Sequence, residues 1–125
     1  MNLNHLKELI IQNLSDDLLS KKWLNYKKQE KLCHPTFGHC YVATEAAYHI
    51  LGGHNYGWKP FYLKCDDDSH WFLKDSSGII FDVTKDQFGD EKILYHKAIG
   101  KGFLTKQPSK RARKLINRVL NTEKD

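Results

Sequence analysis

The chain has 125 residues, close to the commonest size of a single domain, and 40% of them are hydrophobic, which is enough for one sizeable core. No apolar run approaches the roughly 18 residues of a membrane span, and charges interrupt the N-terminus where a signal peptide is apolar. The three cysteines are odd in number and lack CxxC spacing, which disfavours a disulfide framework or a zinc ribbon. We therefore expect one cytoplasmic domain over 1–125.

The N-terminal part, 1–30, has the apolar spacing of two helices. Leucines and isoleucines recur at helical intervals from Leu3 to Leu14, and Ser15 is the expected N-cap of a second helix that continues to Tyr26. We expect both helices to pack on the rest of the domain.

A buried helix is predicted from Cys40 to Leu51, because this segment carries a wide apolar stripe. Gly52 and Gly53 follow, and glycine readily takes the left-handed conformation that closes a helix. The prediction places Cys40 in the first turn of this helix.

Residues 59–84 change to the period of two that is typical of strands. We expect a strand over 59–65, an acidic loop at 66–68, and a hairpin of strands 70–75 and 79–84. The sequence thus predicts an α+β domain with a small antiparallel sheet.

The register of this hairpin follows from its turn. If Ser76, Ser77 and a left-handed Gly78 form a three-residue loop, Asp75 pairs with Ile79. One face is then apolar and contains Trp71, Leu73, Ile79, Phe81 and Val83. The other face contains His70, Phe72, Lys74, Ile80, Asp82 and Thr84. A slip of one residue would mix these two sets, so the hydrophobic pattern selects the register in which His70 and Asp82 are diagonal neighbours.

Cys40, His70 and Asp82 have the properties of a cysteine-nucleophile triad. A helix N-terminus and a neighbouring imidazole both favour the thiolate form of a cysteine. His70 can act as the general base, and Asp82 can bind the second ring nitrogen and orient the imidazole. Each residue alone is more often structural, but their combination predicts attack on a carbonyl carbon, without a cofactor or metal.

The order Cys, His, Asp, with F-G-H-C at a helix start, S-H-W-F at a strand start and F-D-V-T on the next strand, resembles the papain-like and transglutaminase-like cysteine superfamily. It is more closely similar to the small YunG-like family of bacterial and phage proteins, which has corresponding motifs and a basic closing helix. The similarity extends from Pro35 to Val119. It implies a papain-like α+β fold, with the catalytic core over 35–96, and a Cys40–His70–Asp82 triad, but no particular substrate.

The same resemblance directs attention to the oxyanion donor. His39 stands where the family commonly has Gln, and His34, six residues before Cys40, is the alternative donor beside the Cys40 backbone N–H. Phe37, Trp58 and Phe72, together with His39, are expected to line the substrate cleft. We expect a protein, peptide or small amide substrate, and peptidase, isopeptidase, deamidase and transglutaminase activities remain open.

Two metal-binding alternatives are weaker. Cys33, His34, His39 and Cys40 form two adjacent pairs, whereas zinc sites favour ligands two to four residues apart. We expect Cys33 and Cys65 to be reduced, structural residues, because neither begins a helix beside a candidate base and their spacing fits no redox pair. The acidic residues 66–68 lack the glycine and distal Glu of an EF-hand, and we expect a solvated loop that steers basic substrates.

The net charge of +5 is concentrated near the C-terminus, since residues 92–121 contain nine Lys and Arg and no acid. Within the basic part, 108–121, a helix is predicted from Ser109, its N-cap, to Leu120. The rival hypothesis is a non-catalytic module that binds nucleic acid through this segment. Its expected phosphate contacts are Lys106, Lys110, Arg111, Arg113, Lys114 and Arg118.

Overall fold

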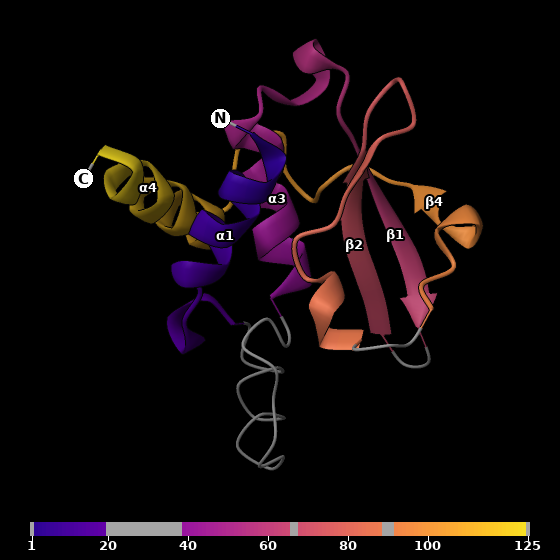
Figure 1. The fold of residues 1–125 in the computed structure, drawn as a ribbon, viewed down its shortest axis with the longest axis horizontal. Coiled ribbons are helices and arrows are strands. Elements are labelled where there is room, and N and C mark those ends of the chain that lie inside the picture. The colour runs from indigo at the N-terminus through magenta and orange to yellow at the C-terminus, as the bar shows by residue number, and fades with distance from the viewer. Residues whose placement is uncertain (1, 20–38, 66–67, 89–91, 125) are drawn as a thin grey trace.

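The fold of this computed structural model is α+β, with three α-helices among the described residues and a small antiparallel sheet, as the sequence predicts. The structure describes residues 2–19, 39–65, 68–88 and 92–124. The helices are α1 (Leu3–Gln12), α3 (Cys40–Ile50) and α4 (Lys110–Lys124). Figure 1 shows them gathered on one side of the sheet, with α3 between the sheet and the other two helices. No helix in the described ranges is long and apolar enough to cross a membrane.

The sheet has the strand order β3-β2-β1-β4, and every neighbouring pair is antiparallel. Its strands are β1 (Lys59–Cys65), β2 (Asp68–Lys74), β3 (Ile80–Phe81) and β4 (Ile99–Gly100). Strand β4 was not predicted, because two residues ending in glycine carry no detectable period. It forms through pairing of Gly100 with Phe61, which only the tertiary arrangement supplies.

The predicted register of the β2–β3 hairpin is confirmed. Leu73 pairs with Phe81, and the backbone N–H of Asp75 donates to the carbonyl oxygen of Ile79 at 2.9 Å. Gly78 has a φ of +89°, the left-handed conformation that closes the three-residue loop. His70 and Asp82 therefore come together as expected.

Two details of the hairpin prediction are wrong. The second strand is only Ile80–Phe81 rather than 79–84, and Ile79 is 51% exposed rather than part of the buried face. The carboxylate of Asp75 accepts the N–H groups of Ser77 and Ile79, so Ile79 belongs to the turn rather than to the strand. After Phe81 the chain leaves the ladder and turns, which places Val83 in the core.

Helix α3 supplies the centre of the core. Its apolar stripe is buried as predicted, and the helix is closed by Gly52 with a φ of +89°. The stripe packs on apolar residues of the sheet and of the two other helices. The largest core side chains that are less than 2% exposed are Leu6, Ile10, Leu18, Leu73, Leu115, Val83 and Val119.

The N-terminal segment follows the prediction in its first half. In α1, Asn2 caps the helix by accepting the N–H of His5 at 2.7 Å. Ser15 then precedes a single 3₁₀ turn, η1 (Asp16–Leu18). The prediction of a continuous helix from Ser15 is wrong at this point, because the Ser15 side chain makes no cap bond and Leu19 has extended backbone. The remainder of that predicted helix, 20–26, lies outside the described residues.

Helix α4 begins where predicted and continues past Leu120 to Lys124. The hydroxyl of Ser109 accepts the N–H of Ala112 at 3.2 Å, so Ser109 is the N-cap. Its own N–H and O–H donate to the two carboxylate oxygens of Glu45 on α3, both at 2.8 Å. Glu45 is only 1% exposed, and it ties the start of α4 to the middle of α3.

Candidate active site

Cys40 is the first residue of α3, and the side chain of the preceding His39 does not cap this helix. Its thiol is reduced and partly exposed, and Sγ–H donates to the carbonyl oxygen of Ser69 at 3.3 Å. That carbonyl belongs to the peptide group that joins Ser69 to His70. The sulfur of Cys40 therefore lies beside the backbone of the predicted base.

His70 and Asp82 form a buried pair. The distance from Nε2 of His70 to Oδ2 of Asp82 is 2.6 Å, and the two side chains are 1% and 2% exposed. A carboxylate oxygen accepts a hydrogen bond, so Nε2 carries the proton in this pair. Nδ1 is then the ring nitrogen that is suited to take a proton from a thiol.

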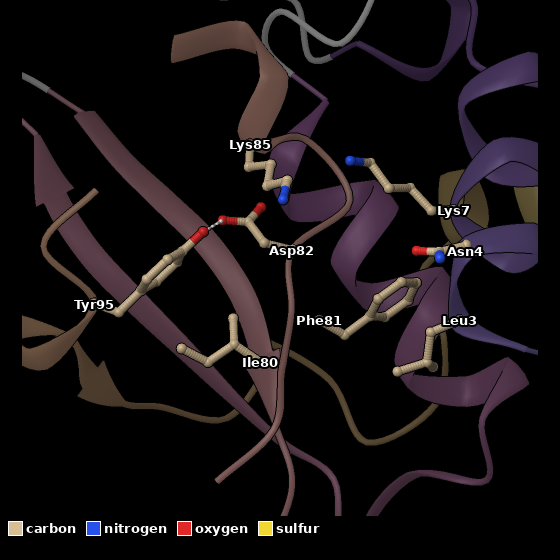
Figure 2. A pocket seen from close by; sticks show the side chains of 8 residues that line it. All are labelled: Leu3, Asn4, Lys7, Ile80, Phe81, Asp82, Lys85 and Tyr95. Carbon is tan, nitrogen blue, oxygen red and sulfur yellow. Dashed lines mark hydrogen bonds between the residues drawn. The ribbon is translucent and has the colours of Figure 1, made fainter. Parts of the chain in front are cut away.

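Tyr95 is a third member of this network. Its hydroxyl donates to the same oxygen of Asp82 at 2.8 Å, as the dashed line in Figure 2 shows. Burial, and next the charge of Asp82, raise the pKa of Tyr95 well above its ordinary value, so the phenol stays protonated and remains a donor. The second oxygen of Asp82, Oδ1, is buried without a hydrogen-bond partner among the described residues. Asp82 is thus held through Oδ2.

A crevice of about 280 Å³ reaches Asp82 from the side of α1. In Figure 2, Lys7 of α1 and Lys85 extend into it from two sides, and Lys7 also pairs with Asp86 at 3.3 Å. Two lysines therefore border the same crevice as Asp82. Lys7 and Lys85 were not predicted as site residues, since no local pattern relates them to Asp82.

His39 has a structural contact. It is 2% exposed, and its Nε2 lies 3.0 Å from the carbonyl oxygen of Ser15, to which it donates. This bond directs the ring toward the N-terminal segment, so Nε2 is not available to a substrate in this conformation. The other oxyanion candidate, His34, lies outside the described residues, as does Phe37.

The expected cleft residues Phe72 and Trp58 are not brought together. Phe72 is 1% exposed and lies between the rings of Phe61, His70 and Tyr95, so it supports the imidazole rather than lining an open surface. Trp58 directly precedes the end of β1 that pairs with the last residue of β2. It packs in the core at the opposite end of the hairpin from Ser69, so its expected place beside Cys40 is not observed.

No group of metal-ligating side chains occurs within the described ranges. Cys33 and His34 of the alternative metal cluster lie outside them, and so does the side chain of Cys65, the last residue of β1. Of the acidic loop, Asp68 is the first residue of β2, while 66–67 are not described.

Four of the six basic residues assigned to the nucleic-acid alternative make contacts within the chain, and one of these contacts is local, from Nε of Arg113 to the carbonyl oxygen of Pro108 at 3.0 Å. Arg118 and Lys114 bind the carboxylate of Asp17, and Arg111 donates to the carbonyl oxygen of Leu18 at 3.1 Å. The hydrogen bonds of Arg118, and next that of Ser15, hold the pKa of Asp17 far below its ordinary value. These cations anchor the N-terminal segment, which leaves fewer of them for phosphate. The exposed members of the set are Lys106, Lys110, Arg113 and Lys114.

No family model matches the chain, and no curated protein or solved structure matches it either. The function proposed for this protein therefore depends on its own residues and their geometry.

Proposed function

We propose that the protein is a cysteine-dependent amide or acyl hydrolase or transferase, with Cys40 as nucleophile, His70 as base and Asp82 as the group that orients the base. The supporting observation is the buried His70–Asp82 pair, whose backbone the thiol of Cys40 contacts through Ser69. We include in the proposal a papain-like fold and membership of the YunG-like family, on the strength of the motifs around these residues.

In the first step, Nδ1 of His70 takes the proton of the Cys40 thiol, and the thiolate attacks the carbonyl carbon of the substrate. A carbon–sulfur bond forms and the carbonyl oxygen becomes an oxyanion. The N–H groups of the first turn of α3, beginning with that of Cys40, point out of the helix start and are the proposed donors to this oxygen.

In the second step, the carbon–nitrogen or carbon–oxygen bond breaks, and the proton held by His70 passes to the leaving group. The thioester on Cys40 is then attacked by water or by an amine, and His70 accepts the proton of that acceptor. Release of the acid or the new amide restores the thiol. A peptide, protein side-chain amide or small amide all contain the required carbonyl group.

Asp82 and Tyr95 act on the base rather than on the substrate. Asp82 keeps Nε2 protonated and stabilises the imidazolium that forms when His70 takes a proton. Tyr95 is a positioning residue, because its hydroxyl holds the carboxylate oxygen that binds His70. Its ring packs edge-on against Phe72, with centroids 4.9 Å apart, which fixes the direction of that hydroxyl.

The test is alkylation of the full chain with iodoacetamide across pH, with the modified residues identified by mass spectrometry. We expect Cys40 to react fastest at pH 6, well below the ordinary thiol pKa of about 8.5. His70→Ala should slow Cys40 at pH 6 far more than at pH 9, where an unaided thiol ionises. Equal reactivity of Cys33, Cys40 and Cys65 in the wild type would contradict the proposal.

Asp82→Asn provides a second variant that keeps the size of the side chain. An amide at this position places a neutral group where the imidazolium needs a charge, so we expect the rate at pH 6 to fall about a hundredfold. Circular dichroism of each variant separates loss of reactivity from loss of fold. An unchanged rate in folded Asp82→Asn would remove Asp82 from the mechanism.

A further inference from the structure

A hollow of about 480 Å³ lies at the end of the β1–β2 hairpin farthest from Cys40. The 3₁₀ turn η2 (Gly53–Tyr56), the start of β1 and the turn after β2 surround it. Its volume falls within the range of small-molecule sites, about 300 to 1,000 Å³. Lys74, which borders it, is four residues beyond His70 on β2, about 13 Å along a strand. The hollow is therefore separate from the proposed catalytic residues.

Two lysines of the hollow face each other across the sheet. Lys59 and Lys74 are direct partners in the β1–β2 ladder, and their ammonium groups lie 5.7 and 5.5 Å from the centroid of the same ring, Phe61. Like charges directly opposite each other destabilise an antiparallel pair. The ring attracts both cations but carries no net charge, so it does not remove their repulsion.

The neighbouring strand makes room for this arrangement. A Cβ at Gly100 of β4 would lie 2.8 Å from Cε and 3.1 Å from Nζ of Lys59. The side chain of Lys59 thus lies across the glycine, which keeps its ammonium group beside Phe61.

Among the described residues, Lys59 and Lys74 have no direct carboxylate partner. Asp75 borders the hollow, but Oδ1 of its carboxylate accepts two N–H groups of its own turn, at 2.9 and 2.8 Å. The hydroxyl oxygen of Tyr48 accepts the N–H of His54 at 3.1 Å, so its hydrogen can be donated to a ligand.

We propose that this hollow binds a small organic anion, a carboxylate or phosphate attached to a flat apolar body. The anionic group lies between Lys59 and Lys74, where it neutralises two opposed charges, and the hydroxyl of Tyr48 supplies a further donor. The apolar body of the ligand packs against the ring of Phe61. The site is distinct from the Cys40 centre, and its occupation does not depend on catalysis.

The test is an NMR titration of the ¹⁵N-labelled full chain at low salt with benzoate and with phenyl phosphate, using benzyl alcohol as the neutral control. We expect saturable shifts at residues around Phe61 and Lys74 with at least one anion, and none with the alcohol. The anion that saturates first identifies the preferred head group. Cys40→Ala should bind the same probe equally, which keeps this result independent of the proposed function.

Lys59→Gln and Lys74→Gln should each weaken the binding about tenfold, the effect of losing one charge-assisted hydrogen bond. The matched control is Lys101→Gln, because Lys101 also lies over an aromatic ring, 5.2 Å from the centroid of Tyr62, but has no opposed lysine there. This control should bind as the wild type does. Absence of saturable shifts with both anions, equal shifts with benzyl alcohol, or equal weakening by Lys101→Gln would overturn the proposal.

Discussion

The two helices that pack on each other, α3 and α4, have opposite arrangements at their N-termini. At α4, Ser109 caps the helix and the buried carboxylate of Glu45 accepts both donors of Ser109. At α3, His39 provides no side-chain cap, and the first residue is the thiol of Cys40. Each helix start presents unpaired N–H groups and a partial positive charge. A carboxylate occupies the start of α4, and Cys40, the proposed nucleophile, lies at the start of α3.

The difference separates a structural helix start, that of α4, from the start of α3, which we propose to be reactive. The carboxylate of Glu45 satisfies the start of α4 and is shielded from solvent, so this end contributes to stability. At the start of α3 the side chain of His39 makes no cap bond, and the sulfur of Cys40 is partly exposed. Four substitutions test this comparison.

The largest effect is expected at the capped end, from Glu45→Ala. The substitution leaves the N–H and O–H of Ser109 without their charged acceptor and opens a cavity between α3 and α4. We expect a loss of about 3 kcal/mol in the free energy of unfolding, since hydrogen bonds to buried charges contribute about 1.5 to 3 kcal/mol each. Urea unfolding measures it. The matched variant, Ser109→Ala, keeps the N–H contact to Glu45 but loses the O–H contact and the N-cap bond, and it should lose about 2 kcal/mol.

Ser109→Cys places a thiol at the start of α4 and tests whether a position at a helix N-terminus is enough to make a thiol reactive. The carboxylate of Glu45 faces this residue, and a neighbouring negative charge disfavours the thiolate. We expect alkylation of Cys at position 109 to be about tenfold or more slower than that of Cys40 at pH 6. The reason is that the negative carboxylate of Glu45 faces position 109, whereas the proposed partner of Cys40 is the imidazole of His70, which becomes positive. Mass spectrometry measures both alkylation rates in one sample of this variant, which carries both thiols. Equal rates would mean that a helix N-terminus makes a thiol reactive without His70.

Tyr95→Phe tests the network behind the reactive end. The phenyl ring keeps its packing on Phe72, but Asp82 loses the hydroxyl that holds Oδ2. We expect alkylation of Cys40 at pH 6 to slow about fivefold, the effect of one hydrogen bond of about 1 kcal/mol. Tyr48→Phe, which also loses one hydroxyl contact but away from Asp82, should leave the rate unchanged. If the two variants behave alike, or if the pH profile of Tyr95→Phe matches the wild type, Tyr95 has only a packing role.

Asp17→Asn should have the smallest effect. The pKa of Asp17 is lowered in the folded chain by Arg118, so its carboxylate stabilises the fold above its unfolded pKa of about 3.9, and this contribution disappears as pH falls below that value. Its side chain is 40% exposed, and surface ion pairs contribute about 1 kcal/mol or less. Unfolding at pH 7 should show a loss of this size, which decreases progressively as the pH falls below about 3.9 toward the lowered pKa of Asp17 in the folded chain. Glu8→Gln, an exposed acid on α1, is the control and should show no such difference.

Much of the β2–β3 hairpin and the start of α3 at Cys40 is determined by the sequence. The alternation of apolar residues and the three-residue loop with Gly78 specify the register, because a slip of one residue would bury Asp82 among the apolar side chains. The apolar stripe that starts after Cys40 likewise locates the N-terminus of α3. These features depend on neighbours within a few positions, so they can be read from the order of residues.

Only the tertiary structure decides which separate elements meet. Nothing in the local pattern relates Tyr95 to Asp82, or Glu45 to Ser109, which is 64 residues away in sequence. The contact of Cys40 with Ser69 likewise depends on how α3 packs against the edge of β2, which the burial of side chains from both elements determines. The same reason explains why Trp58 does not lie beside Cys40. Its position follows from core packing at the end of the hairpin farthest from Ser69, not from its distance in sequence to Cys40.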